Sequence, residues 1–452
     1  MKVRLLRPCL VASALLLGAR LAAQDIPFTR DGEPDPTFDV PPALNLQYAL
    51  AFALDNNFAI RQAKERIRQQ DGVIVEVRSA RIPNVSSSAS YARNADEVST
   101  NGLDYSWGVN ITARQIVYSG GGVAASIRSQ ELAREAAVLA MQAVVNDVLL
   151  GVRTQFYAVL VSRERIQVQE QGVELRRRQL QDVKNRYEAG TVSNFEVLRA
   201  EVALANAQPA LISARNAFRQ AIDDLRQIIG FVTVSQPNLT RIPQFVGTLD
   251  FQPMQPDLAA ALASARELRP ELRRLRLLEA SAEESVKARR SGLLPSVSLF
   301  GSYDWRRAPV SSPNSVRDGW TAGVQADWDI FDGRATAGRV AQAKSVLAQT
   351  RLSTADLQLA IDVEVRRAIS SLQEATELVE ASAKVVEQAE EAVRLAEARF
   401  GAGTATQLDV LTAQTDLTDA RLNQLEAKFR YNVAAADLRR ASGESDELMG
   451  QL

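Results

Sequence analysis

The side chains that most often carry out catalysis are scarce in this chain of 452 residues. It contains no histidine and a single cysteine, Cys9. Histidine supplies most acid–base chemistry near neutral pH, and cysteine supplies nucleophiles and metal ligands. No spacing typical of a nucleophile, of paired acids, of metal ligands or of a nucleotide-binding loop stands out. The sequence therefore predicts no catalytic, cofactor-binding or metal-binding residues, and it argues against an enzyme.

The amino terminus is typical of a secretory signal. Basic residues precede a short apolar run, Cys9–Gly18, and Ala23 offers a cleavage site. We expect residues 1–23 to be removed, which leaves a mature chain without a thiol, and we expect 24–43 to be an extended segment. No later run is apolar enough for a transmembrane helix. A secreted chain of this kind either stays soluble or enters a membrane as a β-barrel.

One stretch of sequence occurs twice. Residues 186–230 begin RYEAGTVSNFEVL, residues 399–443 begin RFGAGTATQLDVL, and the two align without a gap. Internal repeats decide a fold before single residues do, so we expect two similar halves. The expected divisions are a first repeat at 44–230, a linker at 231–256, a second repeat at 257–443 and a tail at 444–452.

Each half contains two segments in which apolar and polar side chains alternate. Alternation over about ten residues is what a membrane-spanning strand requires. The expected strands cover about 84–93 and 105–115 in the first half, and 296–306 and 320–331 in the second. Aromatic residues lie near the segment ends, as in an interfacial girdle: Tyr91, Tyr105, Trp107, Tyr303, Trp305, Trp320 and Trp328. A small soluble sheet is the alternative, and the two matching hairpins make it the weaker one.

Long helices account for most of each half. Helical spacing covers about 44–81 and 257–292, and longer helices are expected at 123–188 and Arg339–Phe400. The last range contains neither Gly nor Pro and is roughly 90 Å long at 1.5 Å per residue. A heptad repeat runs along it: Val365, Leu372, Val379, Val386, Val393 and Phe400. Helices this long must line up side by side.

Tight turns are expected where the long helices end. Gly190 and Gly403 can adopt positive φ there, and Thr191 and Thr404 are expected to help start the returning helices. Four strands cannot close a membrane barrel alone, so the protomer must associate, and three copies are the simplest closure. A barrel continued by a helical tube is a channel. The rival interpretation is a periplasmic coiled-coil scaffold or adaptor, which leaves the paired hairpins unexplained.

On the duplication, the two hairpins and the R-[YF]-x-x-G-T…V-L motif of each half, the sequence resembles the TolC-like outer-membrane efflux and secretion channels. The resemblance covers essentially the whole mature chain. It implies a mainly α fold with a transmembrane β part. Long helical hairpins would form a periplasmic α-barrel, and four strands per protomer would complete a 12-stranded outer-membrane barrel in a homotrimer.

The resemblance also implies a function and a set of partners. The protein would be the passive exit duct of a tripartite efflux pump or type I secretion system, in the outer membrane of a Gram-negative-type cell. It would dock to a periplasmic adaptor and be energised by an inner-membrane efflux or ABC-type transporter. Outer-membrane lipid would surround the barrel. The formal net charge of −1 implies no nucleic-acid partner.

The family's motif lies at the periplasmic tip, which the resemblance makes the entrance. The residues carried over to the tip turns and the adaptor contact are Tyr187, Gly190, Phe400 and Gly403. Those carried over to the gate are Thr191, Glu196, Thr404, Gln407 and Asp409. Asp409 takes the place of an acidic ring residue, and a ring of carboxylates favours cations. Without the resemblance, Asp409 and Glu196 would be interpreted as carboxylates at helix starts. Ala405 and Thr412 depart from the family's arginine latch and second acidic ring.

Overall fold

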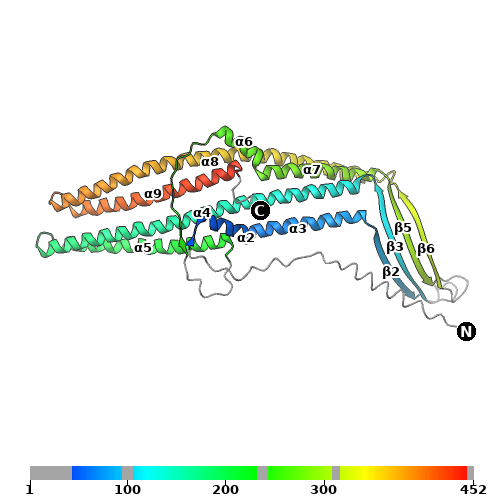
Figure 1. Ribbon diagram of the computed structural model, residues 1–452, viewed down its shortest axis with the longest axis horizontal. Coiled ribbons are helices and arrows are strands. Elements are labelled where there is room, and N and C mark those ends of the chain that lie inside the picture. The colour runs from blue at the N-terminus through cyan, green and yellow to red at the C-terminus, as the bar shows by residue number, and fades with distance from the viewer. Residues whose placement is uncertain (1–42, 94–104, 232–242, 308–315, 445–452) are drawn as a thin grey trace. The chain divides into compact units, whose positions relative to one another are not determined.

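The computed structural model describes residues 43–93, 105–231, 243–307 and 316–444, which all fall in one compact unit. The expected signal, most of the leader, the two hairpin loops, part of the linker and residues 445–452 lie outside the described residues. Within the described part, long helices run from a four-stranded sheet to two tight turns (Figure 1).

The helices come in two sets of matching length. The first set is α2 (Leu46–Asn56), α3 (Phe58–Arg78), α4 (Gly122–Glu188) and α5 (Asn194–Ile229). The second set is α6 (Leu258–Leu268), α7 (Pro270–Arg290), α8 (Ala335–Gly401) and α9 (Gln407–Ser442). The longest, α4 and α8, have 67 residues each, and α5 and α9 have 36 each. The long helices expected at 123–188 and Arg339–Phe400 are therefore observed.

The heptad positions of α8 form its buried stripe. Val365, Leu372, Val379 and Val393 are buried, and Val386 is half-buried. Val365, Leu372 and Val379 belong to a core that α8 forms with α6, α7 and α9, in which Tyr431 is also buried. A second core lies between α2, α4 and α5. Burial of these apolar faces is the main stabilising term, at about 25 cal/mol per Å² removed from water.

Two expected helices are each broken into a pair. The helix predicted over 44–81 is interrupted at Asn57, whose side chain accepts hydrogen bonds from the backbone amides of Ala59 and Ile60 and so starts α3. Its counterpart over 257–292 is interrupted at Arg269. The ring of Pro270 disfavours a helical conformation for the residue before it, and Arg269 has φ −61° and ψ 122°. Short 3₁₀ turns, Ser79–Arg81 and Ser291–Leu293, lead from α3 and α7 to the sheet.

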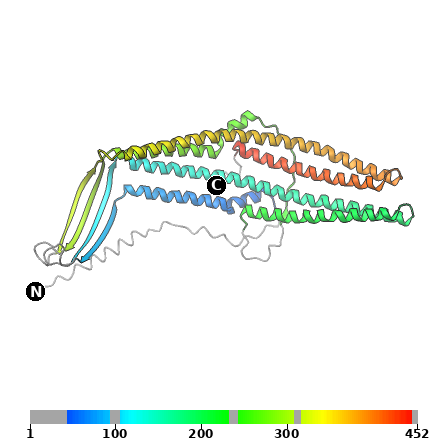
Figure 2. The same cartoon turned by 180° about the vertical axis from the view of Figure 1, so that it is seen from behind.

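The sheet is antiparallel, in the order β2-β3-β5-β6, with β2 and β6 at its edges (Figures 1 and 2). Its strands are β2 (Asn84–Arg93), β3 (Tyr105–Ser119), β5 (Ser296–Arg307) and β6 (Val316–Asp327). The observed β2 matches the expected strand, β3 is four residues longer and β5 one residue longer. The strand expected at 320–331 is wrong in position, because β6 both begins and ends four residues earlier. Trp328 therefore lies outside it.

The linker touches both sets of helices. Its strand β4 (Gln244–Phe245) pairs in parallel with β1 (Ala43–Leu44). Arg163 of α4 donates hydrogen bonds to the carbonyl oxygens of Phe245 and Gly247, and Asn432 of α9 donates to that of Asp250. The linker is thereby held by both long hairpins.

The helices lie side by side in a fixed order. Near the sheet, α3 packs on α4, α4 on α7, and α7 on α8. Toward the turns, α5 packs on α4, α4 on α9, and α9 on α8. In the part of the chain that the structure describes, α4 packs against α2, α3, α5, α7 and α9, while α8 packs against α6, α7 and α9.

One expectation about membrane helices needs correction. No transmembrane helix was predicted after the signal, yet α4 contains a window that is long and apolar enough to cross a membrane. Length and composition alone are weak support for a membrane span. Val145, Leu149 and Val152 of α4 belong to the core with α2 and α5, and about 33% of the apolar window is buried inside the protein.

Candidate functional site at the tips of the helical hairpins

The two hairpins end in the same turn. Gly190 follows α4 with φ 74°, and its amide donates to the carbonyl of Tyr187 at 2.9 Å. Gly403 follows α8 with φ 73°, and its amide donates to the carbonyl of Phe400 at 3.1 Å. This left-handed conformation closes a helix end at low cost only for glycine. The predicted positive φ at both glycines is observed.

Thr191 and Thr404 form hydrogen bonds with the helix that ends at each turn, and not with the helix that begins after it. The Thr191 amide and hydroxyl both donate to the Arg186 carbonyl, at 2.9 and 3.0 Å. Thr404 makes the same pair of bonds to Arg399, at 2.9 and 3.1 Å. Both threonines therefore satisfy carbonyls at the end of the outgoing helix. The prediction that they start the returning helices is wrong, since Ser193 and Thr406 stand at those starts.

Asp409 lies exposed in the first turn of α9, where it completes a capping box. Its carboxylate accepts hydrogen bonds from the Thr406 amide (2.7 Å) and hydroxyl (2.8 Å), and the Asp409 amide donates to the Thr406 hydroxyl (3.3 Å). The hydrogen bonds from the Thr406 backbone and side chain hold the pKa of Asp409 below its usual range. The carboxylate is therefore charged at neutral pH.

Glu196 holds the equivalent place in α5 but makes no such box. Ser193, at the start of α5, has no capping hydrogen bond through its side chain. One carboxylate oxygen of Glu196, Oε2, is shielded from solvent and has no hydrogen-bond partner within the described residues. The two acidic residues that the resemblance assigns to the gate therefore have different surroundings within the protomer.

Gln407 is not presented to solvent at the tip. It is only 2% exposed, and neither its Oε1 nor its Nε2 has a hydrogen-bond partner among the described residues. Gln414, two turns further along α9, is also buried, but its Nε2 donates to Glu397 at 3.3 Å. The burial of Gln407 was not predicted from the sequence, because a polar residue next to a turn is ordinarily exposed. Buried, unpaired amides weaken the packing around them.

An arginine joins the two tips. The Arg186 guanidinium lies over the ring of Phe400 at 4.7 Å from its centroid, and its Nη1 donates to the Phe400 carbonyl at 3.4 Å. Tyr187, next to Arg186, is exposed. The sequence motif contains Arg186 and Phe400, but only the arrangement of α4, α9 and α8 in space reveals that they meet.

Six of the seven aromatic residues singled out in the strands gather toward the hairpin-loop end of the sheet. Tyr91 pairs with Trp107, and Tyr303 pairs with Trp320. Tyr303 and Trp305 have ring centroids 4.2 Å apart, and Tyr105 stacks with Tyr91. Trp328 lies at the opposite end, where its indole N–H donates to the Leu293 carbonyl at 3.2 Å. Their place at a membrane interface stays a prediction.

An ionic network with the buried Arg269 at its centre lies at the break between α6 and α7, and it was not predicted from the sequence. Arg269 donates to Glu271 at 2.9 Å and also to Glu364 of α8. Glu364 accepts in turn from Arg440 of α9, whose Nε donates to Asp147 of α4 at 2.6 Å. The network therefore connects four helices from both halves. Such networks are sensitive to the loss of any single member.

Among the described residues of the first half, no equivalent of this network is found. In the alignment of the repeats, Gly151 and Gln227 hold the places of Glu364 and Arg440.

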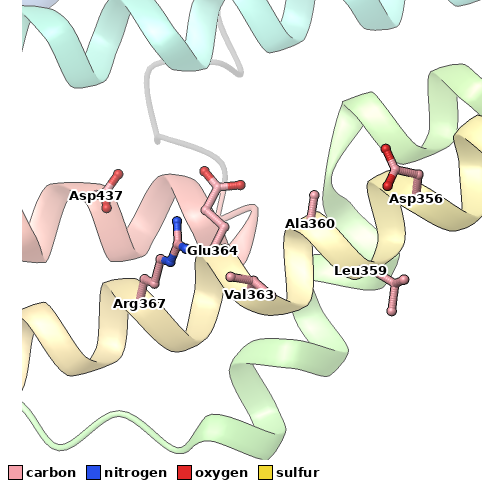
Figure 3. Close-up of a pocket in the computed structure, with 7 residues that line it drawn as sticks. All are labelled: Asp356, Leu359, Ala360, Val363, Glu364, Arg367 and Asp437. Atoms are coloured by element: carbon pink, nitrogen blue, oxygen red, sulfur yellow. The ribbon is translucent and has the colours of Figure 1, made fainter.

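Next to the network, burial raises the pKa of the Asp437 carboxyl. The charge of Arg440 opposes this increase in pKa, and the charge of Glu364 adds to it. A surface cleft of about 440 Å³ opens beside the network (Figure 3). Its lining combines acidic, basic and apolar residues: Asp356, Leu359, Ala360, Val363, Glu364, Arg367 and Asp437.

These features define a class of protein. Long helical hairpins rise from a small antiparallel sheet with two open edges, and the described residues offer no cluster of His, Cys, Asp or Glu that could hold a metal. The family model for outer membrane efflux proteins matches residues 50–231 and 261–444, and the chain belongs to this family. Its members are passive channels, so the protein is an outer-membrane channel protein with a large periplasmic helical part, and not an enzyme.

Similar proteins cover nearly the whole chain. Protein CyaE of Bordetella pertussis is 27% identical over 446 residues, which are 95% of this chain and 93% of CyaE. The outer membrane efflux protein BepC of Brucella suis is 26% identical over 404 residues, which are 87% of this chain and 84% of BepC. The crystal structure of the CmeC outer membrane channel of Campylobacter jejuni superposes with a TM-score of 0.76 at 16% identity, and the match covers 90% of this chain and 88% of CmeC. The last match concerns the fold, and it agrees with the TolC-like architecture.

Proposed function

We propose that the protein is the exit duct of a tripartite efflux pump or a type I secretion system and works as a homotrimer. A periplasmic adaptor would connect it to an inner-membrane efflux or ABC-type transporter that supplies the energy. The single observation that carries the proposal is a four-stranded sheet with two open edges in a chain of this family. Three copies would supply twelve strands and close the barrel.

The helices support the same assembly. Large apolar side chains are exposed along the outer edge of α8, including Val346, Leu352 and Leu359. Exposed apolar stripes on a protein of this kind mark an interaction surface. A periplasmic scaffold without a barrel would account for these helices, but it would leave the paired hairpins without a role.

Size and conductance test the proposal directly. The protein would be extracted from outer membranes in detergent, its mass measured, and its single-channel conductance recorded in a planar bilayer. A trimer with discrete conductance is the expected result. A soluble, non-conducting species would overturn the proposal and favour the scaffold.

The proposed gate lies at the tips. Three copies of Asp409 around one axis would form an acidic ring that favours cations, and the low pKa of the Asp409 carboxyl would keep that ring charged. Thr191, Thr404 and Glu196 lie on the same turns and helix starts. The adaptor would meet the tip turns at Tyr187, Gly190, Phe400 and Gly403.

Block of the purified channel by multivalent cations tests the ring. We expect Asp409→Ala to weaken the block, because the charge is removed. Thr406→Ala is the matched control, since it breaks the hydroxyl half of the capping box and keeps the carboxylate. Unchanged block in Asp409→Ala would exclude Asp409 from the gate. Equal weakening in both variants would assign the effect to the start of α9.

A further inference from the structure

Two arginines lie on one face of the sheet, at the end that is farthest from the helices (Figure 1). Arg93 is the last residue of β2 and pairs with Tyr105 of β3. Arg307 is the last residue of β5 and pairs with Trp107 of β3. Side chains alternate between the two faces of a strand, so both arginines share a face with these aromatic residues.

The rest of this face is mostly apolar. Toward the helices it carries small or aliphatic side chains such as Val297, Ala322 and Val324. The described strands place one acidic residue on it, Asp318, which accepts a hydrogen bond from the Tyr303 hydroxyl at 2.7 Å. The aromatic end of the face therefore carries two positive charges against one negative charge.

The opposite face of the sheet is polar. The Asn110 side chain donates a hydrogen bond to the Asp304 carboxylate of the next strand at 2.6 Å, and the Thr112 hydroxyl donates to the Asn110 side chain at 2.6 Å. In a membrane barrel the polar face lines the lumen and the apolar face meets lipid. Arg93 and Arg307 therefore belong to the face that meets lipid.

Arg307 lies at the level of the lipid headgroups. Val297 and Arg307 are ten residues apart on β5, which corresponds to about 33 Å of strand. Strands of membrane barrels tilt by about 40°, so this distance spans about 25 Å along the membrane normal, which is the height of the apolar band. The helices leave the other end of the sheet into the periplasm, so the arginines lie at the outer leaflet.

A tyrosine lies between the two arginines. The Arg307 guanidinium lies over the Tyr105 ring, 4.2 Å from its centroid, and Tyr105 stacks on Tyr91. Arg93 lies opposite Tyr105 on β2, so the two arginine backbones are two strand spacings apart, about 10 Å. A guanidinium that stacks on a ring through its face keeps its N–H groups in the plane of that face, where phosphate oxygens can accept from them.

We propose that Arg93, Arg307 and Tyr105 bind a phosphate group of lipid A, the phosphorylated glycolipid of the outer leaflet in a Gram-negative-type outer membrane. This inference rests on the proposed barrel and adds a lipid ligand to it. Lipid A is the occupant because the site lies at the outer leaflet and because two guanidinium groups complement a phosphate monoester. Its acyl chains would lie along the apolar rows between these arginines and the helices.

Native mass spectrometry of the detergent-extracted protein with defined lipids tests the site. The probes are lipid A with both phosphates, lipid A without phosphates, and phosphatidylglycerol. We expect the unaltered protein to retain the phosphorylated lipid A most strongly. Arg93→Gln with Arg307→Gln should weaken this binding by about tenfold, because two charge-assisted contacts are lost. Arg306→Gln is the matched control, since Arg306 is next to Arg307 on β5 but lies on the polar face, and it should leave the binding unchanged.

The outcomes separate this inference from the proposed function. A conducting trimer whose double variant binds lipid A as tightly as the unaltered protein would overturn the site and leave the exit duct intact. A conducting trimer that retains phosphatidylglycerol as tightly as lipid A would do the same. If the double variant does not assemble, the unaltered trimer decides, since equal binding of lipid A with and without phosphates would overturn the site. A protein that forms no trimer and conducts no current would overturn the proposed function, and the lipid site with it.

Discussion

The two tips share a turn and differ in the helix that follows it. Both glycines have φ near 73°, and both threonines bond back to the outgoing helix. The returning helix α9 then begins with a capping box between Thr406 and Asp409, while α5 begins without a capping bond from Ser193. The end of a helix is set here by the backbone and glycine, whereas its start depends on side chains that have diverged between the halves.

This difference concerns the acidic residues expected to face the entrance. Asp409 uses its carboxylate to fix the start of α9, whereas one oxygen of Glu196 is shielded and has no partner in the described part of the chain. The second tip is therefore anchored locally, and the first depends more on its contacts with neighbouring helices. Arg186 supplies one such contact by lying over Phe400 of the other hairpin.

The largest effect is expected from a β-branched residue in either turn. Gly403→Val places valine at φ 73°, which costs roughly 1–3 kcal/mol in backbone strain. We expect loss of resistance to exported compounds in cells while the trimer is retained, and Gly190→Val should act alike. Gly401→Ala, inside α8 with open space around it, is the matched control. Full resistance in Gly403→Val would show that this turn is dispensable.

A smaller gain in stability is expected from removing the unpaired amide at the second tip. Gln407→Leu replaces a buried polar group by an apolar one of similar size and should stabilise the protein by about 1–3 kcal/mol. Gln414→Leu should give less, because the Gln414 amide is bonded to Glu397. Thermal unfolding of the detergent-extracted protein measures both. A lower melting temperature for Gln407→Leu would mean that the amide has a partner in the assembled protein.

The helix starts themselves can be compared with two alanine variants. Thr406→Ala should destabilise the first turn of α9 by about 1 kcal/mol, the usual cost of losing a capping side chain. Ser193→Ala should have a much smaller effect on α5, since its side chain makes no capping bond. Local hydrogen exchange reports each helix start separately. Equal effects in the two variants would remove the distinction between the tips.

The smallest expected effect is a dependence on pH. The lowered pKa of Asp409 means that its capping bonds stabilise the folded state above the ordinary aspartate pKa, about 3.9, and lose that contribution as the pH falls through the lower folded value. The difference in melting temperature between wild type and Thr406→Ala should be constant from about pH 6 to 5 and shrink below about pH 4. A difference of unchanged size at the lowest pH would show that the Asp409 carboxylate does not contribute to it.

Sequence reasoning found the parts of this fold that have a strong period. The heptad stripe of α8 and the alternation in β2 are local patterns, and both are observed. The breaks at Asn57 and Arg269 were missed because helical spacing continues across them, although the sequence Arg269-Pro270 was a usable sign. The end of β6 could not be predicted from alternation alone, because strand length also depends on pairing.

The candidate site was less accessible to the same reasoning. Both turn glycines follow from their position after a helix, but the direction in which Thr191 and Thr404 bond depends on the geometry of the turn. The burial of Gln407 and the contact between Arg186 and Phe400 arise only when α4, α8 and α9 pack together. Long-range contacts of this kind leave no periodic sign in the sequence.

The ionic network around Glu364 lies far along α8 from the second tip turn. From Glu364 to Gly401 the helix extends over 37 residues, about 55 Å at 1.5 Å per residue. A tilt of about 10° at that point would carry the far end about 10 Å sideways, simply by the geometry of a rod of that length. A tilt of that size would therefore move the end of α8 by about the width of one helix.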